Sequence, residues 1–126
     1  EKITVTSFTA SLVVGALACA LLAVNNLRDI DGDTLARKRT LAVRLGDKKA
    51  RSFFVSLFVL ALLAIFMLAL SYPLALLGLI GLSSAFASIK RVRSGAVGSE
   101  LISVLSMTGR TQILTAITLS IGLILS

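Results

Sequence analysis

A short polar stretch, residues 24–33, ends a long apolar run and reads Val-Asn-Asn-Leu-Arg-Asp-Ile-Asp-Gly-Asp. If the apolar helix before it continues, Asn25, Asn26, Asp29 and Asp33 are three or four residues apart and share one helix face. Three aspartates within five positions repel one another, and a divalent cation or nearby lysines and arginines relieve that repulsion. Carboxylate and amide oxygens on one face therefore predict a site for a hard cation such as Mg²⁺.

A basic segment follows the aspartates directly. Its lysines and arginines are Arg37, Lys38, Arg39, Arg44, Lys48, Lys49 and Arg51. Proteins hold a diphosphate by combining an acidic pair that binds Mg²⁺ with a concentration of positive charge for the phosphate oxygens. The two neighbouring segments together predict a metal–diphosphate site at a membrane surface.

The composition places the chain in a membrane. Of its 126 residues 56% are hydrophobic and 15% charged, and the mean hydropathy is +0.98, too apolar for an ordinary soluble domain. The net charge of +7 could suggest a nucleic-acid partner. However, the cations gather in two segments between apolar runs, which is typical of positive-inside membrane topology, so we expect no nucleic acid. With no His and only Cys19, zinc, haem and an internal disulfide have no support.

The pattern of apolar runs predicts an all-α membrane protein with about four transmembrane helices and short interfacial helices. The expected spans cover residues 3–27, 51–70, 74–89 and 110–126. The loops 28–50 and 90–109 carry the basic segments, so both are expected on the cytoplasmic side. Within them, residues 34–45 and part of 94–109 are expected as short helices at the interface. Since the chain begins without Met, we expect a piece of a longer polypeptide.

Two sets of small residues are expected where helices approach closely, because small side chains allow close contact in membranes. In the first span they are Ser11, Gly15, Ala18 and Cys19, a stripe that leads through Leu22 toward the aspartates. In the third span they are Gly78, Gly81, Ser84 and Ala85. The first stripe predicts that the face packed into the helix bundle also carries the polar site.

The polar stretch resembles a known family motif. Residues 25–33, Asn-Asn-Leu-Arg-Asp-Ile-Asp-Gly-Asp, followed by residues 38–46, Lys-Arg-Thr-Leu-Ala-Val-Arg-Leu-Gly, resemble the second aspartate-rich motif of the UbiA superfamily of membrane prenyltransferases. The sequence of this motif is most similar to that of the branch that acts on 1,4-dihydroxy-2-naphthoate in menaquinone biosynthesis. Arg37 departs from the family pattern, which usually has glycine before the lysine.

The resemblance implies a nine-helix bundle with a central cavity open to the cytoplasm, of which this chain would be the C-terminal half. The missing N-terminal half would carry the first aspartate-rich motif, so this chain would hold half an active site and be inactive alone. The implied reaction transfers a polyprenyl group from a polyprenyl diphosphate to the aromatic acceptor, with loss of the ring carboxylate and formation of demethylmenaquinone. The implied setting is the lipid bilayer of the plasma membrane.

The implied roles fall on the polar stretch and the basic segment. Asp29 and Asp33 would bind Mg²⁺, and Lys38 would contact the diphosphate and complete the catalytic set with them. Substrate contacts would come from Asn25, Asn26, Arg28, Lys38 and Arg44. Asp31 lies two positions from each of the other aspartates and points to the opposite side of a helix, so we expect it to be a spectator.

Several alternatives stay open or are excluded. A calcium loop needs Gly at its sixth position and Glu at its twelfth, and counting from Asp29 both are threonine, which excludes an EF-hand. Half of a cation-coupled transporter would also use membrane carboxylates, although it predicts charge deep within the spans. A structural subunit would explain the helices and not the motif. Among enzymes, the alternative is a related prenyltransferase with 4-hydroxybenzoate, homogentisate or haem as acceptor.

Overall fold

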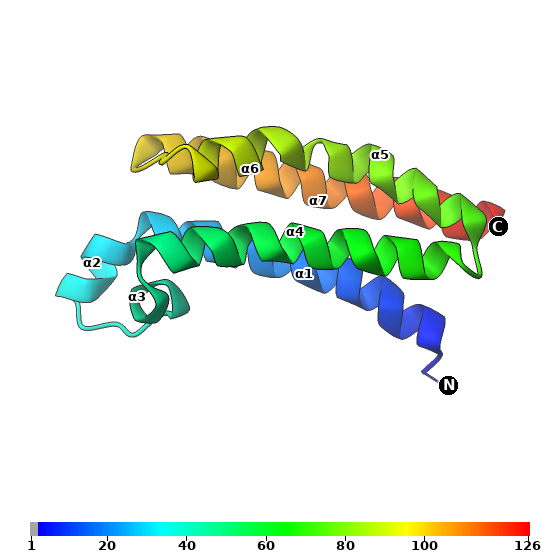
Figure 1. Ribbon diagram of the computed structural model, residues 1–126, viewed down its shortest axis with the longest axis horizontal. Coiled ribbons are helices and arrows are strands. Elements are labelled where there is room, and N and C mark those ends of the chain that lie inside the picture. The colour runs from blue at the N-terminus through cyan, green and yellow to red at the C-terminus, as the bar shows by residue number, and fades with distance from the viewer. Residues whose placement is uncertain (1–2) are drawn as a thin grey trace.

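The computed structural model describes residues 3–126, and all of the regular structure in that range is helical (Figure 1). This confirms the all-α membrane fold class. In chain order the elements are α1 (Val5–Arg28), α2 (Ile30–Leu35), α3 (Leu41–Leu45), α4 (Asp47–Ala69), the 3₁₀ helix η1 (Pro73–Leu77), α5 (Gly78–Ser83), α6 (Ala85–Arg93) and α7 (Ser99–Leu125).

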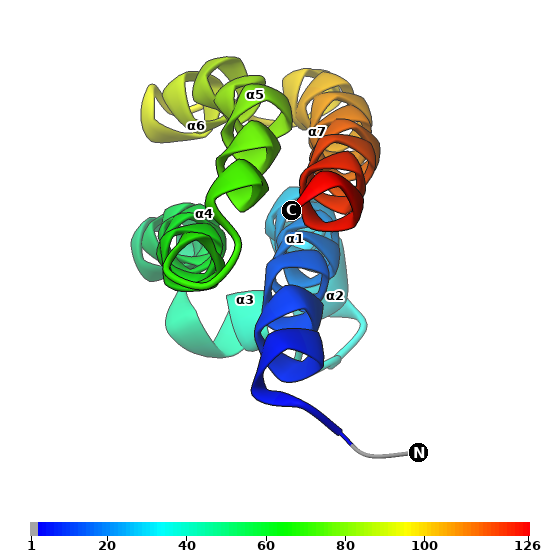
Figure 2. The same cartoon turned by 90° about the vertical axis from the view of Figure 1, so that its right-hand side faces the viewer.

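Three helices are long and apolar enough to cross a membrane, namely α1, α4 and α7. The pair formed by Pro73–Ser83 (η1 and α5) and α6 is also long and apolar enough, with a bend of 48° at the break between Ser83 and Ala85, and it gives a fourth candidate span. Viewed end-on, the four spans occupy the corners of a bundle (Figure 2). The short helices α2 and α3 and the turn between α6 and α7 lie at one end, and the described chain termini lie at the other (Figure 1). Both basic segments therefore lie at the same end of the bundle.

The last span differs from the sequence prediction. Residues 99–109 were expected to form a separate interfacial helix before a span at 110–126, but Ser99–Leu125 is one continuous helix. Its 27 residues extend about 40 Å at 1.5 Å per residue, so the helix is longer than the roughly 30 Å hydrocarbon layer. The polar first turns can therefore lie outside the hydrocarbon without interrupting the helix. Arg110 does not mark the start of a helix, because it lies within the continuous helix Ser99–Leu125. Its side chain is exposed.

The third span was expected as one helix over 74–89, and it is instead broken at Ser84. The Ser84 hydroxyl donates to the carbonyl of Gly81 at 2.8 Å and shares a 2.7 Å hydrogen bond with the hydroxyl of Thr111 in α7. A break in a membrane helix leaves backbone groups that need hydrogen-bond partners. A side-chain hydroxyl that bonds to a backbone carbonyl and to a neighbouring helix supplies such a partner.

The small residues of this span do pack closely, as expected. A methyl group added at Gly81 would lie 2.4 Å from the backbone nitrogen of Thr115, and Gly78 and Ala85 are buried. The backbones of α5 and α7 are therefore in direct contact at Gly81.

The small-residue stripe of α1 lies elsewhere than expected. Ser11, Gly15, Ala18, Cys19 and Leu22 are all exposed on the described chain. The packed face carries the larger apolar side chains Val13, Leu17, Val24 and Leu27 together with the smaller Thr9, Ala16 and Ala20. Larger side chains remove more apolar surface and make more contacts, which explains why this face packs against α4 and α7.

Candidate functional site

The site begins where α1 ends, at the end of the bundle that holds both basic segments. Asp29 is the junction between α1 and α2, with φ −96° and ψ 8°, and its amide donates to the carbonyl of Asn25 at 3.2 Å. The amide of Asp33 in turn donates to the carbonyl of Asp29 at 2.8 Å, four residues back. The expected helical path therefore passes through the polar stretch with one distorted residue, which keeps both aspartates near the end of α1.

Arg28 binds its two polar neighbours. Its guanidinium donates from Nε to Oδ1 of Asp29 at 2.8 Å and from Nη2 to Oδ2 at 3.1 Å. The same Nη2 donates to the amide oxygen of Asn25 at 2.8 Å. These charge-assisted bonds from Arg28 lower the pKa of Asp29 below its ordinary value, so Asp29 stays ionised at neutral pH.

Asp33 and Lys38 are brought together by the turn that ends α2. The amide of Lys38 donates to the carbonyl of Asp33 at 2.8 Å, and the amide of Arg37 donates to the carbonyl of Thr34 at 3.1 Å. This pair of bonds is a Schellman motif, and it places Nζ of Lys38 3.9 Å from Oδ1 of Asp33. The Asp33 side chain is only 15% exposed, whereas that of Lys38 is 69% exposed and free to move toward a ligand.

Arg37 occupies the left-handed position of this motif, with φ 57°, and it is the one non-glycine residue with positive φ among residues 3–126. A second Schellman motif ends α6, with bonds from the amides of Gly95 and Ala96 to the carbonyls of Val92 and Arg91. There Gly95 takes the left-handed position, with φ 95°. The departure from the family pattern at Arg37 thus falls on the backbone position where glycine is favoured.

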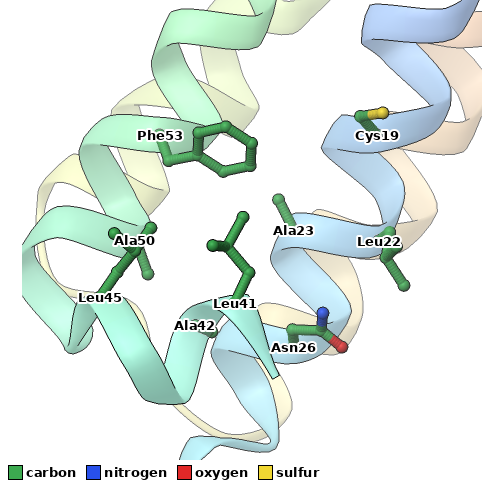
Figure 3. A pocket seen from close by; sticks show the side chains of 9 residues that line it. All are labelled: Cys19, Leu22, Ala23, Asn26, Leu41, Ala42, Leu45, Ala50 and Phe53. Carbon is green, nitrogen blue, oxygen red and sulfur yellow. The ribbon is translucent and has the colours of Figure 1, made fainter. Parts of the chain in front are cut away.

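An apolar cavity of about 130 Å³ lies beside Asn26, between α1, α3 and α4 (Figure 3). Ala23, Leu41 and Phe53 point into its centre from these three helices (Figure 3). Asn26 is the polar residue at its edge. Helix α3 forms one wall through Leu41, Ala42 and Leu45, and Thr40 caps this helix by accepting a 3.3 Å hydrogen bond from the amide of Val43. The cavity has the size and apolar lining of one that holds a single ring-sized apolar group.

Two other residues singled out in the sequence, Arg44 and Asp31, make fewer polar contacts. Arg44 lies in α3 with an exposed side chain, and Asp31 is exposed in α2. Neither forms an ion pair within the described part of the chain. Asp31 therefore lies as a solvated side chain, and its role as a spectator stays a prediction.

The two carboxylates of Asp29 and Asp33 fit a site in which Mg²⁺ is bound together with a phosphate ligand. No cluster of three or more carboxylate, thiol or imidazole groups exists among residues 3–126, so the described chain offers no all-protein cage. Mg²⁺ does not require one, because it usually binds one or two carboxylates and fills its other positions with water and phosphate oxygens. Each oxygen of Asp29 that accepts from Arg28 retains a second lone pair, so the ion pair does not block coordination.

Sequence reasoning missed two features of this end. The first is the cavity, one of whose lining residues, Cys19, was expected only as a small residue at a helix contact. The second is Arg51, which donates to both carboxylate oxygens of Asp47 at 2.8 and 3.0 Å and to the carbonyl of Val92 at 2.8 Å. The four-residue spacing of Asp47 and Arg51 signals their ion pair, but no local signal indicates a bond to a residue 41 positions away.

Comparison with known proteins gives one consistent result. A model of the UbiA prenyltransferase family matches residues 1–103. The 1,4-dihydroxy-2-naphthoate octaprenyltransferase of Mycobacterium tuberculosis is 42% identical over 107 residues, which are 85% of this chain and 37% of that protein. The protein of the same name from Escherichia coli is 32% identical over 124 residues, 92% of this chain and 40% of that protein. The chain thus spans well under half the length of these relatives. No solved structure gives a significant match.

Proposed function

The chain belongs to the UbiA prenyltransferase family, and from that premise we propose that it forms the diphosphate-binding part of a membrane prenyltransferase. The complete protein transfers a polyprenyl group from a polyprenyl diphosphate to 1,4-dihydroxy-2-naphthoate and so serves menaquinone biosynthesis. The single observation that carries this proposal is the geometry at the end of α1, where Asp29 lies beside the guanidinium of Arg28 and Asp33 lies beside the ammonium of Lys38.

In this proposal Asp29 and Asp33 hold Mg²⁺, and Lys38 contacts the diphosphate. Mg²⁺, when bound, supplies positive charge to the phosphate oxygens as a Lewis acid. Lys38 is suited to its role because it is anchored through its backbone and its exposed ammonium can turn toward a phosphate. Arg28 acts mainly by fixing the orientation of Asp29 and Asn25, since three of its donor contacts are already made to them.

The reaction that this charge arrangement favours is electrophilic. The allylic carbon–oxygen bond breaks with both electrons going to the diphosphate, whose growing negative charge Lys38 and Arg28 stabilise. The ring carbon that bears the carboxylate attacks the allylic carbon, and loss of CO₂ returns the electron pair to the ring. The cavity beside Asn26 would exclude water from an apolar group during this step, which protects the allylic cation from hydrolysis.

The choice of acceptor rests on the names of the relatives, and the remaining partners follow from their length. The matched relatives are called 1,4-dihydroxy-2-naphthoate octaprenyltransferases, and this chain covers 37–40% of the two described above. We therefore propose that the first aspartate-rich motif and the rest of the cavity come from the N-terminal half of the complete protein. The basic end of the bundle faces the cytoplasm in the plasma membrane, as the positive-inside rule requires.

The test is prenyl transfer by the complete protein in membranes, with polyprenyl diphosphate, Mg²⁺ and either 1,4-dihydroxy-2-naphthoate or 4-hydroxybenzoate. We expect product from the naphthoate alone, and a roughly 100- to 1,000-fold lower rate for Asp33→Asn, the size of effect seen when one charge-stabilising group is lost. Asp31→Asn is the matched control, with the same change two residues away on an exposed side chain, and it should retain the rate. Equal loss in both variants would contradict the assigned roles, and transfer to neither acceptor would contradict the reaction.

A further inference from the structure

A second cavity, of about 430 Å³ and with a polar lining, opens at the basic end of the bundle, between the start of α4 and the end of α6. We call it the basic mouth, and its polar lining consists of Asp47, Lys48, Arg51, Ser52 and Arg93. No residue of α1 or α2 lines it, so it is separate from the site around Asp29 and Asp33. It has no role in the proposed transfer reaction.

An apolar groove of about 370 Å³ lies between the same two parts of the bundle, farther along α4. We call it the α4–α6 groove, and Val59, Leu62, Leu82, Phe86 and Ile89 are among its lining residues. It lies between α4 and the bent α5–α6 span, which run beside each other in Figure 1.

The mouth and the groove lie along one continuous track. On α4 the lining residues Lys48, Ser52, Val55, Val59 and Leu62 follow at intervals of three or four, which places them on one helix face. On the opposite side, Phe86, Ile89 and Arg93 follow with the same spacing. From Lys48 to Leu62 the track is about 21 Å long at 1.5 Å per residue, which is enough to cross one leaflet of a roughly 30 Å hydrocarbon layer.

The charges of the mouth favour an anion. Arg51 is fixed by Asp47 and by the carbonyl of Val92, so its positive charge is largely compensated. Lys48 and Arg93 have no acidic partner among the ion pairs of residues 3–126. Two unpaired cations therefore stand at the polar end of an apolar track.

We propose that this track binds an anionic phospholipid of the bilayer, with its phosphate at Lys48 and Arg93 and an acyl chain in the α4–α6 groove. A basic pocket between membrane helices on the side that carries positive charge is the type of site that anionic headgroups occupy. The apolar continuation distinguishes it from a site for free phosphate, which would gain nothing from the groove. The bound lipid would link the start of α4 to the end of α6, in parallel with Arg51.

The experiment measures lipid binding to the complete protein by native mass spectrometry from detergent, with phosphatidylglycerol and phosphatidylcholine of identical acyl chains. We expect retained phosphatidylglycerol, and about fivefold weaker binding for Lys48→Gln and for Arg93→Gln, the effect of removing one basic side chain at an anionic surface. Lys49→Gln is the matched control, because it removes the same charge from the next residue, which does not line the mouth. Equal weakening by Lys48→Gln and Lys49→Gln would mean general surface attraction and would overturn the site.

The groove is tested separately. Val59→Phe fills the groove and should weaken phosphatidylglycerol binding, whereas Leu60→Phe, on an adjacent exposed residue outside the groove, should not. Glycerol phosphate, which has no acyl chain, should not compete with the lipid, and full competition by it would identify a phosphate site instead. Competition by a polyprenyl diphosphate would likewise overturn the phospholipid assignment. These readouts do not depend on prenyl transfer, so failure here and failure of the proposed reaction can be told apart.

Discussion

Replacing Arg37 by glycine should stabilise the turn that holds Lys38 beside Asp33. Arg37 has φ 57°, and among residues 3–126 the hydrogen bonds that hold it in the Schellman motif are made by the backbone. A side chain in the left-handed region costs about 1–2 kcal/mol. Glycine removes that cost but gains about 0.4–1 kcal/mol of unfolded-state freedom, which opposes the stabilisation. The net expectation is a turn more stable by about 0.5–1 kcal/mol.

The assay is amide hydrogen exchange at residues 37 and 38 in the complete protein, because both amides are bonded only while the turn is closed. A gain of this size slows exchange by roughly two- to fivefold after correction for intrinsic rates. Arg37→Ala is the decisive control, since it removes the guanidinium but keeps the Cβ atom, and it should leave exchange unchanged. Slowing by alanine as large as that by glycine would refute the backbone explanation and assign the effect to charge. In the matching motif, Gly95→Ala should speed exchange, and an added Cβ there meets nothing within 4 Å.

Two further expectations concern packing and pH. Gly81→Ala should lower the stability of the complete protein by about 1–3 kcal/mol, because its Cβ would lie 2.4 Å from the backbone of Thr115. Gly109→Ala, whose Cβ would meet only a side-chain atom at 3.7 Å, should be nearly neutral in the same detergent unfolding measurement. Because Arg28 lowers the pKa of Asp29, the pair adds stability above the ordinary carboxyl pKa of about 3.9 and loses it as pH falls through the lowered value. In Arg28→Gln the Asp29 carboxyl should therefore titrate at higher pH by carbon-detected NMR, and an unchanged midpoint would refute this cause.

The sequence was sufficient for those features that depend on local spacing. Backbone hydrogen bonds join Asn25 to Asp29 and Asp29 to Asp33, as expected for residues four apart in a helix. The helix repeat alone therefore predicts that these residues lie near one another. The location of both basic segments at one end also follows from counting spans. The close approach at Gly81 was predictable because small residues in a membrane span allow helix backbones to come into contact.

Other features depend on bonds between distant residues or on choices between similar faces. The apolar composition of the third span gives no sign of its bend, which depends on Ser84 and Thr111 meeting across two helices. The small-residue stripe of α1 was expected on the packed face but is exposed within residues 3–126, because small and large apolar faces are both compatible with packing. The proximity of Lys38 to Asp33 requires the left-handed backbone at Arg37, and arginine is not a residue that signals such a turn.

The hydrogen bond between Ser84 and Thr111 also has a consequence for biosynthesis. The two residues are 27 positions apart, and ribosomes add about 5–20 residues per second, so Thr111 is made about 1–5 s after Ser84. During this interval the third span lacks the partner that its break uses in the finished bundle. The hydrogen bond across the break therefore forms only after Thr111 has been synthesised, and chains that stop before Thr111 would lack it.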